Sequence, residues 1–251
     1  LNNYGVVYFD EIDDIFPTTI DLSGSEFSIS AVYNWNEESN RGARLIDGTT
    51  NWLMGPHAGR HRAFAGLFSP GKTVVKDKYA SQSVISLADT LYNFVNGIDY
   101  DSVNANYRPG IISLANQLNG SLAELLIVNG NVDKSLVGEI DNYLMDKYAP
   151  PLELGENKSV CNFPDSILIQ NESYTNFLWS TGDTTSKLIF DSAGLYKVTV
   201  TDIFDRIYVD SLFIDSNTFD YNINLTFEDT TICSGDSLSI YAGNPSYNYQ
   251  W

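Results

Sequence analysis

The first 150 residues consist of short apolar and β-branched runs separated by turn-forming residues, and this pattern strongly limits the fold. FSISAVYNW at residues 27–35 alternates, so that every second side chain from Phe27 to Tyr33 shares one face of a half-buried strand. Asn96-Gly97 lies between two apolar stretches, which is a strong β-hairpin signal. Other strand-like runs lie at residues 4–9, 43–48, 51–55, 110–115 and 121–130. This spacing predicts an all-β sandwich or barrel.

One segment, residues 133–149, departs from this pattern and is predicted to be a short amphipathic helix. Its apolar residues follow helical spacing and are Leu136, Val137, Ile140, Tyr143, Leu144 and Tyr148. Asp133 or Ser135 can cap the start of the helix, and Pro150-Pro151 ends it. We expect this helix to pack back on the sandwich, with a linker after it.

The second half of the chain contains an internal repeat. Cys161 precedes Trp179, and Cys233 precedes Trp251 in a similar context of an Asp-Ser-apolar strand. The length of chain from Cys161 to Cys233, where the pattern starts again, suits a small β-sandwich plus a linker. We therefore predict one complete small sandwich at residues 156–216 and the truncated start of a second one at residues 224–251.

Several motifs of the first 150 residues resemble those of concanavalin A-like, laminin G-like jelly-roll modules in bacterial surface proteins. They include VVYFDEIDD, RLIDGTTNWLMGPH and YNFVNG. The most specific are GSLAEL at residues 120–125 and YLMDKY at residues 143–148, which match a closing strand and helix of that family. The resemblance implies a jelly-roll sandwich with one short C-terminal helix.

The second half resembles the immunoglobulin-like repeats of Bacteroidota surface adhesins and gliding-associated proteins. The match is carried by LWSTGDTTSKLIFDSAGLYKVTVTD at residues 178–202. This resemblance implies export by the type IX secretion system and a role in surface attachment or gliding motility. Family repeats often carry a second Cys where this chain reads IFDRIYVDS, so Cys161 lacks that partner. We expect Cys161 and Cys233 to be unbridged, or Cys233 to pair beyond Trp251.

The formal net charge of −18 excludes some classes of partner. A chain this acidic repels phosphate backbones, so we predict no nucleic-acid binding. No apolar run approaches the length of about 20 residues that a membrane-spanning helix needs, so we predict no membrane insertion. Acidity of this degree suits an extracellular protein at the cell surface.

The stretch DEIDDIF at residues 10–16 resembles the carboxylate motif of β-glucan hydrolases. Glu11 and Asp13 alternate as in that motif, but Ile15 and Phe16 stand where a final Glu is required. A retaining glycosidase needs two carboxyl groups about 5 Å apart, one of them acting as general acid. We interpret the stretch as an acidic turn and predict a non-enzymatic chain; the alternative is a polysaccharide-degrading enzyme or its accessory module.

Candidate ligand-binding residues include a basic island and exposed aromatic rings. The island comprises His57, Arg60, His61 and Arg62 within GPHAGRHR, where it could contact an anionic ligand. Gly and Pro in that segment argue against a helix that would present His57 and His61 to zinc. Aromatic rings can stack on pyranose faces, and the candidates are Trp35, Trp52, Tyr92 and Tyr107. Trp35 and Trp52 have the alternative of being core residues, and Trp179 is expected in the core of its own repeat.

Loop carboxylates offer candidate calcium ligands, because calcium prefers oxygen ligands. Two pairs stand out, Asp13 with Asp14 and Asp99 with Asp101. Calcium is the one cofactor that the sequence suggests. Together these features predict a secreted, multidomain adhesin whose jelly roll binds a glycan or a surface and whose immunoglobulin-like repeats act as spacers.

Overall fold

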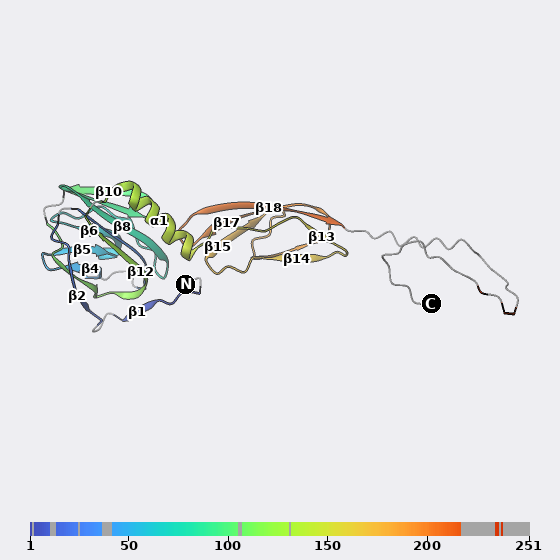
Figure 1. The fold of residues 1–251 in the computed structure, drawn as a ribbon, viewed down its shortest axis with the longest axis horizontal. Coiled ribbons are helices and arrows are strands. Elements are labelled where there is room, and N and C mark those ends of the chain that lie inside the picture. Colours follow the sequence, from blue (N-terminus) through green and yellow to red (C-terminus); the bar gives the residue numbers. More distant parts are fainter. Residues whose placement is uncertain are drawn as a thin grey trace.

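The computed structural model describes residues 1, 3–10, 14–24, 26–36, 42–104, 107–130, 132–216, 234–235 and 237. These residues form two β-sandwiches placed end to end (Figure 1). The sandwiches are called here the N-terminal sandwich (β1–β12 with α1) and the C-terminal sandwich (β13–β18). The predicted all-β class is confirmed. Most of the predicted second repeat, at residues 224–251, lies outside the described residues.

The N-terminal sandwich consists of two six-stranded antiparallel sheets that face each other. Sheet I has the order β1 (Val7–Asp10), β12 (Asn119–Asn129), β3 (Phe27–Trp35), β8 (Tyr79–Leu87), β9 (Thr90–Val95) and β10 (Ile98–Asn104). Sheet II has the order β2 (Phe16–Asp21), β11 (Ile111–Asn116), β4 (Arg44–Gly48), β5 (Trp52–Gly55), β6 (Arg60–Phe64) and β7 (Lys72–Thr73). The chain crosses repeatedly between the sheets, as in a jelly-roll sandwich.

The core of the N-terminal sandwich lies between these sheets. The predicted inward face of β3, from Phe27 to Tyr33, is buried there, and the ring of Phe27 meets Trp52 edge-on at 5.8 Å. Asn96 and Gly97 form the predicted hairpin between β9 and β10, with φ angles of 53° and 73°. Positive φ at both positions suits the type I′ turn that Asn-Gly favours.

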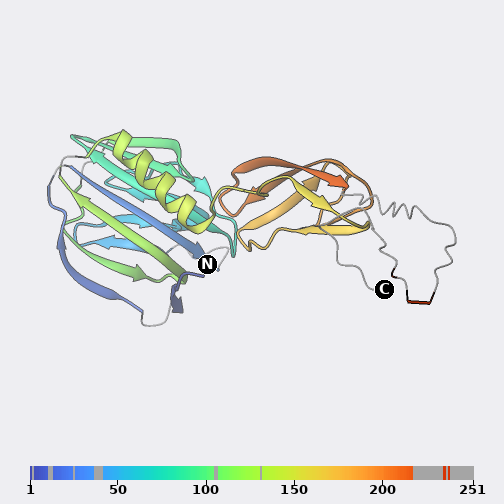
Figure 2. The same ribbon diagram turned by 45° about the vertical axis from the view of Figure 1, so that its right-hand side comes forward.

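Helix α1 (Lys134–Tyr148) covers the outer face of sheet I (Figure 2). Asp133 caps it by accepting a hydrogen bond from the Leu136 amide at 2.8 Å, so the predicted helix and one of its two candidate caps are confirmed. Leu144 and Met145 pack against Val32 of β3. Within the described residues, no helix has the length and apolarity of a membrane span.

The C-terminal sandwich has its own core between two smaller sheets. One sheet has the order β13 (Lys158–Val160), β18 (Ile207–Ser216), β17 (Gly194–Asp202) and β15 (Tyr174–Trp179), in which β13 runs parallel to β18. The other pairs β14 (Asp165–Leu168) with β16 (Lys187–Phe190). Trp179 is buried in this core, as predicted, and its indole N–H donates to the Thr185 carbonyl at 2.9 Å. Cys161 is exposed and has no disulfide partner within the described residues, while Cys233 lies outside them.

A turn of the C-terminal sandwich joins it to the end of α1. Arg206 donates to Asp146 at 2.6 Å, to buried Asp202 at 2.7 Å, and to the Met145 and Ala149 carbonyls at the end of the helix. Phe204 is buried against the same helix end. These contacts fix the two sandwiches relative to each other.

Candidate ligand-binding face

The outer face of sheet II is the side of the N-terminal sandwich away from α1. Strand register places Ser113, Asp47, Leu53 and Phe64 opposite one another in a row across four strands. The adjacent row, which contains Ile46, Met54 and Ala63, is buried in the core. Side chains alternate between faces along a strand, so the Asp47–Phe64 row points outward. Leu53, in the middle of this row, is 2% exposed, so the accessible part of the face lies toward the two ends of the row, at Asp47 and Phe64.

One end of this face carries a compact group of rings and charges, called here the aromatic–basic cluster: His57, Arg62, Phe64 and Phe68. The His57 ring stacks on Phe68 at 5.0 Å between ring centroids and 11° between planes. The Arg62 guanidinium lies 5.2 Å from the centre of the same ring, within the range of a cation–π interaction. The Phe64 ring lies 4.6 Å from Phe68. Phe68 is thus the hub of the cluster.

The backbone around β6 positions these side chains. Arg60, Arg62 and Phe64 alternate outward along β6, while His61 and Ala63 point into the core. A single bridge pairs Phe64 with Phe68 and folds the following loop back over the strand. Gly71 in that loop has φ of 67°, and a Cβ atom there would lie 2.5 Å from the His61 carbonyl oxygen. The close approach therefore requires glycine.

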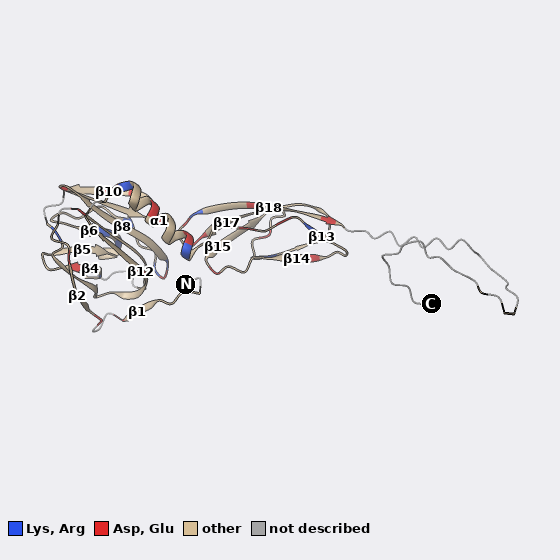
Figure 3. Ribbon diagram, in the orientation of Figure 1, with Lys and Arg blue, Asp and Glu red and all other residues tan. Residues whose placement is uncertain are grey.

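The same loop holds the arginines through its carbonyl groups. Arg60 Nε donates to the Gly71 carbonyl at 2.9 Å, and Arg62 Nη2 donates to the Pro70 carbonyl at 3.2 Å. The Gly71 amide donates to Asp101 Oδ2 at 2.6 Å, which brings β10 to the edge of the cluster. Two guanidinium groups beside one carboxylate leave this edge locally positive in an acidic chain, in which basic positions are sparse (Figure 3).

Three buried polar atoms here have no hydrogen-bond partner within the part of the chain that the structure describes. They are His57 Nδ1, Arg62 Nε and Asp101 Oδ1. Burial and the neighbouring Arg44 and Arg62 lower the pKa of His57, which favours the neutral imidazole. An unpaired buried polar group costs roughly 1–3 kcal/mol, so these atoms favour a water molecule or a polar ligand beside them.

The other end of the face carries a hollow of about 220 Å³ beside Asp47. Arg44 Nη1 donates to Asp47 Oδ1 at 2.5 Å, and Asn116 Nδ2 donates to Asp47 Oδ2 at 2.7 Å. The hydroxyl groups of Thr18 and Ser113 lie on strands beside it. Both donors fix the carboxylate, leaving its remaining lone pairs to accept from hydroxyl groups of a ligand.

Three of the predicted ligand-binding residues are wrong because they are buried. His61 is 4% exposed, and its Nδ1 atom lies 2.6 Å from the Tyr33 hydroxyl inside the sandwich. The Tyr33 hydroxyl also donates to Gln82 Oε1 at 2.6 Å. Burial lowers the pKa of His61 to about 3 and keeps it neutral. Trp35 and Trp52 are buried in the core, so neither ring can stack on a sugar.

The remaining predicted residues do not form one site. His57 and Arg60 lie at the aromatic–basic cluster, and exposed Tyr107 is close by, because its amide donates to the Ala65 carbonyl at 3.2 Å. Tyr92 lies on sheet I, where the Lys134 ammonium group sits 3.8 Å from its ring centre. The predicted residues that lie near one another are therefore His57, Arg60 and Tyr107, whereas Tyr92 lies on the other sheet.

The predicted calcium ligands are also dispersed where they can be described. Asp99 is ion-paired with Lys134 at 2.7 Å, whereas Asp101 accepts from the Gly71 loop. Asp14 accepts from the Asp10 amide at 2.8 Å, and Asp13 lies outside the described residues. Within the described residues, no three His, Cys, Asp or Glu side chains gather as a metal site would require.

Sequence reasoning missed Phe64, Phe68 and Asp47. A search for Trp and Tyr as sugar-stacking rings overlooks Phe, although AFAGLF at residues 63–68 directly follows the basic island. Asp47 lies in a turn-rich segment and is indistinguishable there from an ordinary turn residue. Cross-strand register, which the sequence does not display, places it on the outer face of sheet II.

Comparison with solved structures finds loosely similar β-sandwich proteins. A heptameric SAP-like pentraxin from Limulus polyphemus has a TM-score of 0.40 at 8% identity, covering 54% of this chain and 80% of the pentraxin. The binding domain of botulinum neurotoxin DC, solved with SialylT, has a TM-score of 0.38 at 13% identity, with 84% and 65% covered. A Trypanosoma rangeli sialidase has a TM-score of 0.36 at 13% identity, with 51% and 24% covered. No family model and no curated relative matches the chain.

Proposed function

We propose that the N-terminal sandwich is a glycan-binding module and that the outer face of sheet II is its binding surface. The observation that carries this proposal is the aromatic–basic cluster, in which the His57 ring, the Arg62 guanidinium and the Phe64 ring all contact the Phe68 ring. Sugars present apolar CH faces beside hydroxyl groups that both donate and accept hydrogen bonds. A surface that combines rings, guanidinium groups and carboxylates complements both properties.

The charge of the cluster favours a saccharide that carries carboxylate or sulfate groups. Arg60 and Arg62 lie side by side on β6, whereas the bulk of the chain is acidic. A guanidinium group recognises planar anions through paired N–H donors, and Arg62 Nε has no partner within the described residues. A negatively charged chain gains selectivity from such a local positive patch, because the remaining surface repels the same ligand.

We further propose that the whole protein is an extracellular, non-enzymatic adhesin of the type IX secretion system, acting in surface attachment or gliding. In this proposal the laminin G-like module presents its ligand face, and immunoglobulin-like units hold it away from the cell. The buried Trp179 and the parallel pairing of β13 with β18 support the immunoglobulin-like interpretation. The Arg206 contacts support a spacer role, since a rigid joint transmits position and load between units.

The test is a glycan array of residues 1–251 with acidic and neutral saccharides, in calcium and in chelator. Phe68→Ala and Arg62→Gln are expected to weaken binding to acidic glycans roughly tenfold or more, as truncation of central contacts usually does. Phe213→Ala is the matched control, because Phe213 is 43% exposed and Phe68 is 42% exposed, on different sandwiches. Loss of binding in chelator would indicate that the site requires calcium. Binding that both variants leave unchanged would refute the proposed face.

A further inference from the structure

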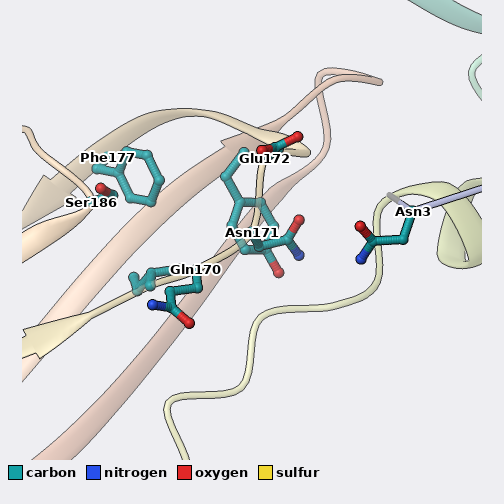
Figure 4. A pocket seen from close by; sticks show the side chains of 8 residues that line it. Asn3, Gln170, Asn171, Glu172, Phe177 and Ser186 are labelled. Carbon is teal, nitrogen blue, oxygen red and sulfur yellow. The ribbon is translucent and has the colours of Figure 1, made fainter. Parts of the chain in front are cut away.

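The C-terminal sandwich carries a larger hollow than the proposed ligand face. It encloses about 560 Å³ and lies where the start of the chain meets the turn between β14 and β15 (Figure 4). Phe177 and Ser186 lie at one side of it, and Asn3 lies across it from Asn171 (Figure 4). Its volume falls within the roughly 300–1,000 Å³ typical of small-molecule sites.

Two sequence-distant parts of the chain build this hollow. Asn3 belongs to the segment before β1, which is held because the Tyr4 ring packs edge-on against Tyr148 at 5.4 Å. The opposite wall belongs to the C-terminal sandwich, where the Tyr174 hydroxyl donates to the Pro150 carbonyl at 2.8 Å. Both walls are therefore anchored at the joint between the two sandwiches.

The lining combines side-chain amides with a ring. Asn3, Gln170 and Asn171 each carry a carboxamide, which both donates and accepts hydrogen bonds. Asn171 accepts at its side-chain oxygen from the Ser173 hydroxyl at 2.6 Å, and its side chain also interacts with the Tyr174 hydroxyl. Phe177 is half-buried on the edge strand β15, with the Tyr174 ring edge-on behind it at 6.3 Å.

The charge of the lining differs from that of the aromatic–basic cluster. Of the described residues that line the hollow, none is Lys, Arg or His, and Glu172 is its single charged group. An anionic ligand would therefore meet no counter-charge here and one like charge. Carboxamides, a serine hydroxyl and a supported ring suit a ligand that has hydroxyl groups and apolar faces but no negative charge.

We propose that this hollow is a second ligand site, which binds an uncharged saccharide. The site belongs to the unit that otherwise acts as a spacer, and it does not depend on the proposed function of sheet II. Phe177 provides the stacking platform, and Asn3, Gln170 and Asn171 provide the hydrogen bonds. Because Asn3 comes from the start of the chain, a bound saccharide spans the joint and contacts both sides of it.

The experiment measures binding of residues 1–251 to neutral oligosaccharides of glucose, xylose and mannose, with uronate-containing oligosaccharides in parallel. Phe177→Ala and Gln170→Ala are each expected to raise the dissociation constant for a neutral oligosaccharide about tenfold. Leu178→Ala is the matched control, since Leu178 neighbours Phe177 on β15, is 56% exposed and does not line the hollow. Thermal unfolding of each variant confirms that it is folded.

The Arg62→Gln variant distinguishes the hollow from the sheet II face experimentally. If the proposal holds, Arg62→Gln leaves neutral binding unchanged, while Phe177→Ala leaves acidic binding unchanged. Failure of all neutral oligosaccharides to bind would overturn the second site and leave the sheet II face untouched. Neutral binding that Arg62→Gln abolishes, or that folded Phe177→Ala retains, would overturn it as well. Binding of a cationic peptide in place of sugars would assign the hollow to a peptide and also refute the proposal.

Discussion

A buried carboxyl group between α1 and sheet I gives the chain a specific pH dependence. Asp141 of α1 is 1% exposed and accepts hydrogen bonds from the hydroxyl groups of Ser81, at 3.3 Å, and Ser83 on β8. Ser83 Oγ lies 2.7 Å from Ser30 Oγ on β3 and, since its own proton points to Asp141, accepts from the Ser30 hydroxyl. Burial raises the pKa of Asp141 from its usual value near 3.8 to about 6, even though the serine hydroxyl groups favour the ionised form.

This shift predicts that the N-terminal sandwich loses stability as the pH rises. Between pH 4 and pH 6 the folded protein keeps a proton on Asp141 that the unfolded chain has released, so each pH unit lowers the free energy of unfolding. One unit of pKa shift corresponds to about 1.4 kcal/mol, so the total loss is about 3 kcal/mol. The contribution is fully present below pH 4 and absent above about pH 6.

The assay compares urea unfolding of the wild-type chain and Asp141→Asn from pH 4 to pH 8, followed by tryptophan fluorescence and circular dichroism. Asparagine keeps the size of the side chain and can still accept from the serine hydroxyl groups, but it does not titrate. The stability of Asp141→Asn relative to wild type should therefore rise by about 3 kcal/mol across this range. Glu139→Gln, on the exposed side of α1, is the control and should show no such change. Equal pH dependence in Asp141→Asn and wild type would refute the reasoning.

Three further substitutions test other parts of the structure. Tyr33→Phe leaves buried His61 without its hydroxyl partner and should cost about 1–3 kcal/mol in the free energy of unfolding, measured in urea. Arg206→Met leaves fully buried Asp202 without its cation and should cost about 3–5 kcal/mol in the free energy of unfolding. The same substitution should let the two sandwiches move independently, which small-angle scattering would detect as a broader distribution of dimensions. Trp52→Ala removes a core ring and should cost about 3–5 kcal/mol, measured by chemical denaturation.

The features that sequence reasoning predicted correctly are those in which local pattern and tertiary packing agree. Strand β3 alternates because one face lies in the core, and the same alternation is visible in residues 27–35. Helix α1 has helical spacing, an Asp cap and a Pro stop within one short segment. The hairpin at Asn96-Gly97 depends on two residues that accept positive φ. Each of these needs no information from distant parts of the chain.

Strand β8 shows why other elements could not be predicted. Its centre reads Ser81-Gln82-Ser83, a polar run that gives no strand signal, yet all three residues are buried. The two serines face Asp141 of α1, and Gln82 joins the Tyr33 hydroxyl inside the sandwich. Their burial is possible because distant side chains complete their hydrogen bonds. The polar run hides the first half of the strand from hydrophobic periodicity, although Val84 and Ile85 of the same strand are buried on its two faces.

The alternation of side chains along β6 explains why the sequence pointed to only some residues of the candidate site. GPHAGRHR drew attention because basic residues are rare in this chain, but alternation along β6 sends His61 inward and Arg60 and Arg62 outward. Three consecutive basic residues therefore give one core residue, His61, and two surface hydrogen-bond donors, Arg60 and Arg62. Phe68 joins the arginine through a loop that depends on Gly71, so the site arises from backbone geometry as much as from residue type.

The asymmetry of the N-terminal sandwich links its folding to its proposed role. Helix α1 buries the outer face of sheet I, and that interface contains a titrating carboxyl group, so the stability of this side of the sandwich depends on pH. On the outer side of sheet II, Arg62 Nε of β6 and Nδ1 of the neighbouring His57 have no hydrogen-bond partner within the described residues. Unpaired polar groups lower stability, and they are tolerated where a ligand can complete them. A ligand that binds this face should therefore raise the melting temperature of the chain, whereas Phe68→Ala should remove that increase.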